Sequence, residues 1–189
     1  MEIRDRYGDE RRTEIVEDDS DIAIEDLITE EDMAVTVSHE GYVKRTPVTE
    51  YRLQHRGGRG VQGATTKDGD FVEQMFVAST HDHLLFFTNL GRIYRARVYE
   101  LPQAGRTSRG KHAANVLELQ RENEKEGTQE ETIRTCLVIP RNFQDRSDLK
   151  HILMCTANGI CKKIDMLDPT RLRRTGIRGI SLDEGDSLI

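Results

Sequence analysis

Short apolar stretches alternate with turn residues along this chain, and three of them follow one pattern. Each begins with a β-prone run and a hydroxyl residue, continues through two residues and a Gly, and ends with a second β-prone run closed by a base. Glycine in a short loop adopts positive φ at little cost, and Val, Ile, Phe and Tyr favour strands. The pattern therefore predicts three β-hairpins, with hydroxyl residues Ser38, Thr88 and Thr156 and turn residues Gly41, Gly91 and Gly159.

A second landmark repeats behind each hairpin at nearly constant spacing. The Gly of an Arg-Gly pair follows the turn glycine by 19, 19 and 20 positions, as Arg59-Gly60, Arg109-Gly110 and Arg178-Gly179. Further β-prone runs occupy 71–77 and 133–139. Units of about four strands that recur every ~50 residues are typical of propeller blades. We therefore predict an all-β fold of propeller-like blades, each with about four antiparallel strands.

These units divide the chain into predicted parts. Blade one is expected at 33–80, blade two at 81–140 with a polar insert at 121–131, and an incomplete blade three at 150–189. Residues 185–189 resemble 69–72, where the last strand of the first unit begins, so we expect a piece of a longer protein. Residues 1–32 lack the repeat and carry frequent acids, which predicts a mostly irregular acidic connector.

Charge is distributed unevenly along the chain. The formal net charge is −6, yet residues 1–33 hold 14 acids and 4 bases, whereas residues 34–120 hold 8 acids and 12 bases. A basic body suits a polyanionic partner, and the acidic arm is either a solvated linker or a competitor for the same surface. The apolar runs are short, no secretory signal is present, and the three cysteines have no metal-ligand spacing. We therefore expect no membrane protein, secreted disulfide scaffold or zinc ribbon.

The chemically distinctive segment is Gln54–Gly60, in which Arg56 and Arg59 stand among three glycines. Arginine grips phosphate oxygens through a planar fork, and glycine lets the main chain approach a sugar-phosphate strand. We interpret the segment as a phosphate-binding loop; the alternative is a glycine-rich connector whose arginines only aid solubility. The overlapping Gly58–Gly63 run fits the dinucleotide pattern G-x-G-x-x-G, but no helical period follows it, so we reject that interpretation.

This segment resembles the Gln-Arg-Arg-Gly-Gly-Arg-Gly box of the C-terminal domains of DNA gyrase A subunits, and six of its seven positions are identical. His55 stands where the family has Arg, which replaces a permanent charge by a titratable one. The flanking Gly41–Arg45 and Glu50–Arg52 segments fit the family context, and Tyr7–Ile15 resembles the end of the breakage-reunion domain. The resemblance covers essentially the whole chain.

The resemblance implies a β-pinwheel, a propeller-like ring of blades with altered strand exchange, around whose basic rim duplex DNA bends. It implies that the box wraps DNA into a positive crossover, so that the ATP-dependent type II topoisomerase holoenzyme introduces negative supercoils. The DNA-binding residues carried over are Gln54, His55, Arg56, Gly57, Gly58, Arg59 and Gly60 in the box, and Lys44, Arg45, Arg95, Arg106, Arg109, Lys162, Lys163, Arg173, Arg174 and Arg178 on the rim.

The resemblance also fixes what we expect to lie elsewhere. Nothing in the chain resembles the surroundings of the DNA-cleaving Tyr, so this part of the enzyme is expected to cleave nothing. It is expected to bind no cofactor or metal, because ATP and Mg²⁺ are used elsewhere in the holoenzyme. The implied partners are double-stranded DNA, the B subunit of gyrase and a second A subunit, with no membrane and no small-molecule substrate. The implied location is the bacterial cytoplasm, at the nucleoid.

Blander interpretations compete at several positions. The box argues against the related topoisomerase IV A-subunit domain, and the repetition of the bases argues against a propeller-like protein-interaction module, which has no reason to repeat them. His81 and His83 flank Asp82 in a pattern that could suggest a metal, but we expect structural or exposed roles because no obvious third ligand is nearby. Cys155 and Cys161 fall in facing hairpin strands and are interpreted as packing thiols.

Overall fold

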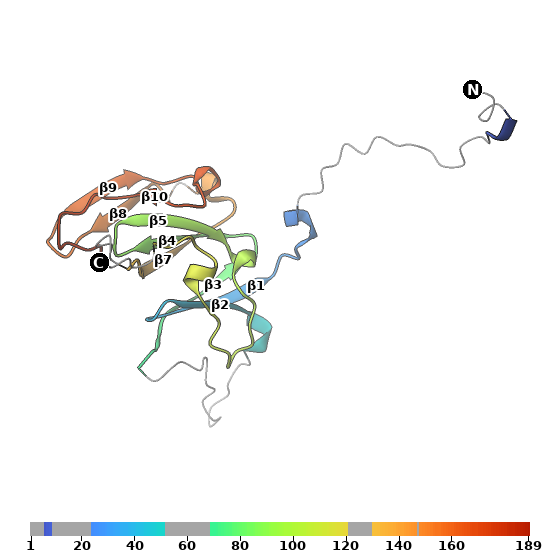
Figure 1. Cartoon of the computed structure of the whole chain (residues 1–189), viewed down its shortest axis with the longest axis horizontal. Helices are drawn as coiled ribbons and strands as arrows, with labels where there is room; N and C mark the ends of the chain where they lie inside the picture. Colours follow the sequence, from blue (N-terminus) through green and yellow to red (C-terminus); the bar gives the residue numbers. More distant parts are fainter. Residues whose placement is uncertain (1–5, 9–23, 52–68, 121–129, 147) are drawn as a thin grey trace.

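The structure is a computed structural model that describes residues 6–8, 24–51, 69–120, 130–146 and 148–189 (Figure 1). The predicted box at 54–60 and most of the polar insert lie outside these residues. Within the described part, no helix is long and apolar enough to cross a membrane. Short 3-10 turns are found at η1 (Ile24–Leu27), η2 (Val48–Glu50), η3 (Val98–Glu100), η4 (Ala113–Asn115), η5 (Phe143–Asp145) and η6 (Pro169–Arg171).

The first sheet is antiparallel and contains four strands. Its strands are β1 (Asp32–Ser38), β2 (Tyr42–Pro47), β3 (Val72–Ser79) and the short β6 (Lys111–His112). Their order across the sheet is β3-β1-β2-β6. The hairpin predicted around Gly41 is therefore β1–β2, and the run predicted at 71–77 forms β3, which pairs with β1.

The second sheet repeats this arrangement, and the third is smaller. The second contains β4 (His83–Thr88), β5 (Arg92–Arg97), β7 (Ile133–Ile139) and β10 (Ile177–Arg178), in the order β10-β5-β4-β7. The third is the hairpin β8 (His151–Cys155) and β9 (Cys161–Asp165). An all-β fold with four-stranded antiparallel blades is thereby confirmed. Leu188 forms an isolated bridge with Thr156, the position that Val72 and Ile133 occupy opposite Ser38 and Thr88.

In each four-stranded sheet, one of the two edge strands comes from the following unit. β6 follows the Arg109-Gly110 pair of unit two but pairs with β2 of blade one, and β10 of unit three pairs with β5 of blade two. In both cases the exchanged strand begins opposite the second residue after a turn glycine, at Val43 and Ile93. Neighbouring blades are thus interlocked by strand exchange, as the resemblance implies for a β-pinwheel.

The strand exchange shows that the predicted equivalence of Gly179 with Gly110 in the third unit is wrong. Gly110, at φ +87°, directly precedes Lys111, the partner of Val43, whereas Gly176, at φ +74°, directly precedes the partner of Ile93. Gly176, not Gly179, is therefore the equivalent of Gly110. The Arg-Gly pairs match in sequence, but the glycine that is equivalent in the structure is the one at which the chain turns to pair with the preceding blade.

A hydroxyl and a carboxylate anchor each hairpin turn, which explains the repeated Ser or Thr. The hydroxyl oxygens of Ser38, Thr88 and Thr156 each accept the backbone N–H four residues later, at 3.1, 3.3 and 3.2 Å. Asp70 and Asp186 accept the N–H groups of the turn residues Glu40 and Asn158, both at 3.0 Å, and Glu131 accepts the Thr88 hydroxyl at 2.7 Å. These bonds fasten each hairpin to the segment that follows the carboxylate, which is β3, β7 or the stretch around Leu188.

Two hydrophobic cores lie between consecutive blades. The first joins Met33 and Val35 of β1 to Leu84 and Phe86 of β4. The second joins the other face of β4, including Leu85, to the third hairpin. Because β4 is buried on both faces, blade two is the middle layer of the described structure.

Candidate nucleic-acid interface

The first predicted rim contact, Lys44, lies in the interior. Its side chain is only 1% exposed, and its ammonium donates hydrogen bonds to the carbonyl oxygens of Gly105 at 3.2 Å and Arg106 at 2.6 Å. Burial lowers its pKa, although Glu50 partly opposes this shift. The expectation of a surface contact is therefore corrected: the loop of the next unit covers Lys44 and uses its charge to satisfy two carbonyl groups.

Arg45 and Arg95 connect consecutive units. The Nε of Arg45 donates to the carbonyl oxygen of Leu101 at 2.9 Å, and the Nε of Arg95 donates to that of Leu172 at 2.8 Å. Both acceptors directly follow a 3-10 turn of the next unit, η3 or η6. These half-buried guanidiniums therefore fasten one blade to the next, a role that their position at the end of a hairpin did not reveal.

Exposed bases gather where the exchanged strand β6 meets β2. The guanidinium of Arg109 lies 5.0 Å from the centroid of the Tyr42 ring, which packs edge-on against His112 with centroids 5.5 Å apart. Lys111 on β6 is exposed, and Arg106 is half-buried. Arg109 and Arg106, both predicted contacts, thus flank the first blade junction. Lys111 was missed by sequence reasoning, although it follows the Arg-Gly pair directly.

A pair of arginines marks the second junction. Arg178 on β10 stands directly opposite Arg92 on β5. Arg92 donates to the Thr175 carbonyl oxygen at 2.6 Å and lies 3.8 Å from the buried carboxylate of Glu131, while Arg178 is exposed. Like charges at directly opposed positions of two strands repel each other, so this position favours a bound anion. Arg92 was not predicted; its place directly after a turn glycine was the available signal.

Glu131 organises the interior of this junction. It is 3% exposed and accepts hydrogen bonds from the hydroxyl groups of Thr88 and Tyr94, both at 2.7 Å, and from the N–H of Gln120 at 2.8 Å. Burial raises the pKa of Tyr94, and its bond to Glu131 adds to the rise. The carboxylate therefore balances part of the Arg92 charge from inside, which leaves Arg178 on the outside.

The remaining predicted contacts belong to the third unit. Lys163, Arg173 and Arg174 are exposed. Lys162 is exposed as a residue, although its ammonium donates to the carbonyl oxygen of Gly179 at 2.8 Å. These cations and Arg178 are distributed over β9, β10 and the segment between them, and Lys162 and Lys163 lie on opposite faces of β9.

The described end of the acidic connector lies against the start of blade two. Thr80 donates its hydroxyl to the Thr29 carbonyl oxygen at 2.9 Å and its N–H to the Glu31 carbonyl oxygen at 3.0 Å. Glu25 lies 3.2 Å from the guanidinium of Arg97. Arg97 is thus paired with the connector and contributes little to the basic surface.

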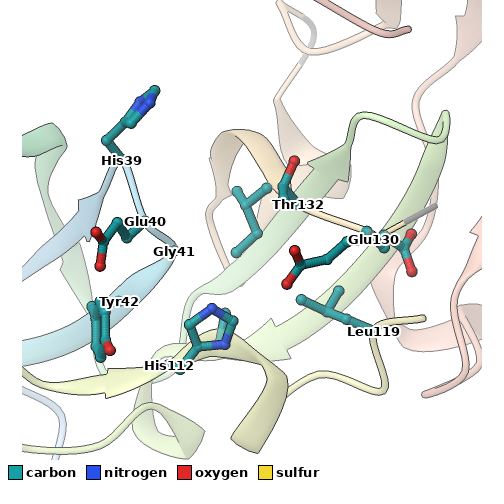
Figure 2. Close-up of a pocket in the computed structure, with 11 residues that line it drawn as sticks. His39, Glu40, Gly41, Tyr42, His112, Leu119, Glu130 and Thr132 are labelled. Carbon is teal, nitrogen blue, oxygen red and sulfur yellow. The ribbon is translucent and has the colours of Figure 1, made fainter. Parts of the chain in front are cut away.

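A cavity of about 330 Å³ opens between blades one and two (Figure 2). Its walls are the β1–β2 turn with His39 and Glu40, the residues His112 and Leu119, and the 130–133 segment. Figure 2 shows Glu40 and Glu130 on opposite walls of this cavity. The carboxylates of Glu40, Glu130 and Glu131 among its lining residues make it an unfavourable place for a phosphate.

The candidate metal pattern at 81–83 has structural functions. His81 contacts the Thr80 hydroxyl and the Glu25 carbonyl oxygen, at 3.3 and 3.2 Å. Asp82 accepts the N–H groups of Ser79 and Arg141, at 2.9 and 3.0 Å. Among the described residues, no group of three or more His, Cys, Asp or Glu side chains is arranged to hold a metal ion.

Antiparallel blades that exchange their outer strands, with bases at the exchange points, define a propeller-like β domain with a candidate polyanion surface. The family model for the DNA gyrase C-terminal domain, a beta-propeller, matches residues 32–79, 82–118 and 150–189. The chain therefore belongs to this family, which confirms the resemblance carried by the box.

Known proteins agree with this assignment. The chain is 46% identical over 188 residues to the DNA gyrase A subunit of Mycolicibacterium smegmatis, with 100% of this chain and 21% of that protein covered. It is 45% identical to the DNA gyrase A subunit of Neisseria gonorrhoeae, again over 100% of this chain and 19% of that protein. The chain thus spans about a fifth of the length of these relatives.

Solved structures support the fold. The C-terminal domain of DNA topoisomerase IV is similar with a TM-score of 0.66 and 30% identity, over 85% of this chain and 45% of that one. The DNA gyrase A C-terminal domain has a TM-score of 0.58 and 25% identity, over 84% of this chain and 46% of that one.

Proposed function

We propose that this chain binds duplex DNA along its blade junctions and bends it, within the A-type polypeptide of a gyrase. The observation that carries the proposal is the pair Arg92 and Arg178, because two arginines at directly opposed positions of a strand-exchange junction favour a bridging phosphate. The first junction supports it with Arg109 and Lys111 at and beside β6, although Tyr42 and His112 occupy the pair positions there that Arg92 and Arg178 occupy at the second junction. Bases at successive junctions would follow a curved backbone.

The proposed recognition is of the DNA backbone and its shape. The candidate bases lie on short exchanged strands, hairpin edges and loops, and no described helix is long enough to read a major groove. Smooth bending of a 20–30 base-pair site costs about 1–6 kcal/mol, so several phosphate contacts are needed to offset it. The contacts that we propose are Arg92, Arg106, Arg109, Lys111, Lys162, Lys163, Arg173, Arg174 and Arg178.

The box residues Gln54, His55, Arg56, Gly57, Gly58, Arg59 and Gly60 complete the proposed surface on the strength of the sequence resemblance. We propose that they wrap DNA into a positive crossover, as expected for the first blade of this family. His55 stands where the family has Arg, so the charge of the loop would depend on pH.

In the longer protein, the proposed activity is ATP-dependent introduction of negative supercoils at the bacterial nucleoid. The partners would be the B subunit of gyrase and a second A subunit, in a holoenzyme with two copies of each. ATP and Mg²⁺ would be used outside this chain, as would the DNA-cleaving Tyr, so this chain alone should not cleave DNA.

A salt series tests DNA binding by the chain alone. We expect the affinity for a duplex of about 40 base pairs to fall with salt, with a log–log slope of about −0.9 per phosphate neutralised. Arg178→Ala should make the slope about 0.9 shallower. Arg146→Ala is the matched control, because that charge is already paired with Asp148 at 2.7 Å. Absence of binding at low salt by the folded chain would contradict the proposal.

The C-terminal domain of topoisomerase IV is the second candidate, since it shows the higher TM-score of the two solved domains described above. Ligation of nicked circular DNA in the presence of the chain separates the two. A gyrase-type domain should change the linking number, and Arg56→Ala combined with Arg59→Ala should reduce that change more than it reduces binding. Unchanged wrapping by the double variant would favour the topoisomerase IV type.

A further inference from the structure

We propose that Cys155 and Cys161 form an oxidisable dithiol, a site at which a peroxide creates a disulfide across the third hairpin. The two residues are direct partners in the antiparallel pairing of β8 and β9. Cys155 is half-buried and Cys161 is exposed, so the pair can be reached from solvent. This inference does not depend on DNA binding.

The backbone holds the pair at a position without direct hydrogen bonds between the two residues. The carbonyl oxygen of Cys155 accepts the N–H of Ile189 at 3.1 Å, which directs it away from β9. The neighbouring pair is hydrogen-bonded, because the Thr156 N–H donates to the Ile160 carbonyl oxygen at 2.9 Å. Residues at such a non-hydrogen-bonded position have Cα atoms about 4.5 Å apart. A disulfide accepts roughly 4.4–6.8 Å, so no backbone rearrangement is needed.

The side chains share one face of the hairpin and contact each other. A hydrogen bond with Cys161 is the main reason that the pKa of Cys155 is raised, which indicates direct contact between the thiols.

The chemistry balances with hydrogen peroxide as the only oxidant. The Cys161 thiolate attacks one peroxide oxygen, the O–O bond breaks, and the hydroxide that leaves takes up a proton to give water and a sulfenic acid. Cys155 then attacks the oxidised sulfur, an S–S bond forms, and the S–O bond breaks to release a second water. Two thiols and one peroxide thus give one disulfide and two waters, and a reducing thiol reverses the change.

The third cysteine provides an internal control. Cys136 on β7 is 7% exposed in the first core, and burial raises the pKa of its thiol. It should therefore remain reduced under conditions that oxidise the pair. The same experiment in urea, where all three thiols are accessible, gives the result expected without the folded geometry.

The chain itself offers a direct assay for the bond. Asn158-Gly159 is the only Asn-Gly sequence and lies between the two cysteines, so hydroxylamine cleaves the chain there into 1–158 and 159–189. The folded protein is exposed to a small excess of hydrogen peroxide, alkylated, cleaved and examined with and without reductant. Intact mass is measured before cleavage.

We expect a loss of about 2 Da per molecule, with fragments that stay joined until reductant is added. Cys136→Ser should behave identically, whereas Cys155→Ser and Cys161→Ser should each release separate fragments. The proposal is overturned if the folded parent releases separate fragments after peroxide treatment. It is equally overturned if bonds to Cys136 predominate in the folded protein.

Discussion

The Leu85 face of the β4–β5 hairpin and the Leu153 face of the β8–β9 hairpin consist of equivalent positions in the same register. Their surroundings differ. On the first hairpin His83, Leu85 and Phe87 stand opposite Arg97, Arg95 and Ile93; on the second, His151, Leu153 and Cys155 stand opposite Asp165, Lys163 and Cys161. The third hairpin covers the first face, and Leu85 is 0% exposed there. Leu153 is 68% exposed.

This difference teaches that a repeat position acquires its role from the unit that follows it. Where the following unit covers the end of a hairpin, a basic residue there connects two blades, as Arg95 does through the carbonyl oxygen of Leu172. Uncovered, the corresponding Lys163 remains available to an external anion. The same reasoning removes Lys44 from the predicted DNA contacts and retains Lys162.

The largest expected difference between the two faces concerns their leucines. Leu85→Ala should lower the free energy of unfolding by about 2–5 kcal/mol, because it removes buried contacts and leaves a cavity between blades. Leu153→Ala, at the equivalent exposed position, should change it by less than about 0.5 kcal/mol. Urea unfolding of both variants measures this difference; equal losses would mean that the exposed face is covered in solution.

We expect the equivalent basic residues Arg95 and Lys163 to differ in effect: Arg95 should contribute to stability and Lys163 to DNA binding. Arg95→Ala leaves the Leu172 carbonyl oxygen without its donor, so we expect a loss of about 1–3 kcal/mol in unfolding free energy. Lys163→Ala should leave stability within about 0.5 kcal/mol and make the salt slope of DNA binding about 0.9 shallower. A destabilised Lys163→Ala protein with unchanged DNA binding would reverse the assignment.

The histidines should differ in their effect on the pH dependence of stability. Burial, with smaller effects of Arg97 and Arg95, lowers the pKa of His83 to about 4. The pKa of His in an unfolded chain is about 6.5, so protonation favours the unfolded chain. The contribution of His83 is therefore complete above about pH 6.5 and declines as pH falls toward about 4, by about 3 kcal/mol.

His83→Gln tests this expectation, because it should flatten the decline of unfolding free energy between those pH values. His151→Gln is the control, since that exposed ring lies 3.2 Å from the exposed carboxylate of Asp165. If both variants keep the slope of the parent, His83 has the same pKa in the folded and the unfolded chain, which contradicts the expectation.

Local features of this fold could be predicted from the sequence. The hairpins around Gly41, Gly91 and Gly159 and the strands after them follow from β-prone runs and turn glycines, which act over a few residues. The repeated hydroxyl residues were noticed, but their carboxylate partners were not, because Glu131 lies 43 positions from Thr88.

Strand exchange could not be predicted by the same means. The match of Gly176 with Gly110 depends on pairing with β5 and β2, far away in sequence. The burial of Lys44 likewise depends on carbonyl groups about 60 positions later. A composition-based interpretation treats every such base as a surface charge, and only the positions of the neighbouring units separate covered from uncovered ones.

Strand exchange also has a consequence for the synthesis of this chain on the ribosome. Tyr42 on β2 pairs with His112, 70 positions later (112 − 42), so the first sheet cannot close when its own hairpin emerges. At about 5–20 residues per second, the β2 edge stays open for roughly 4–14 s. An open edge can pair with another nascent chain on the same messenger. The finished fold, in which β6 covers this edge, no longer displays that exposure.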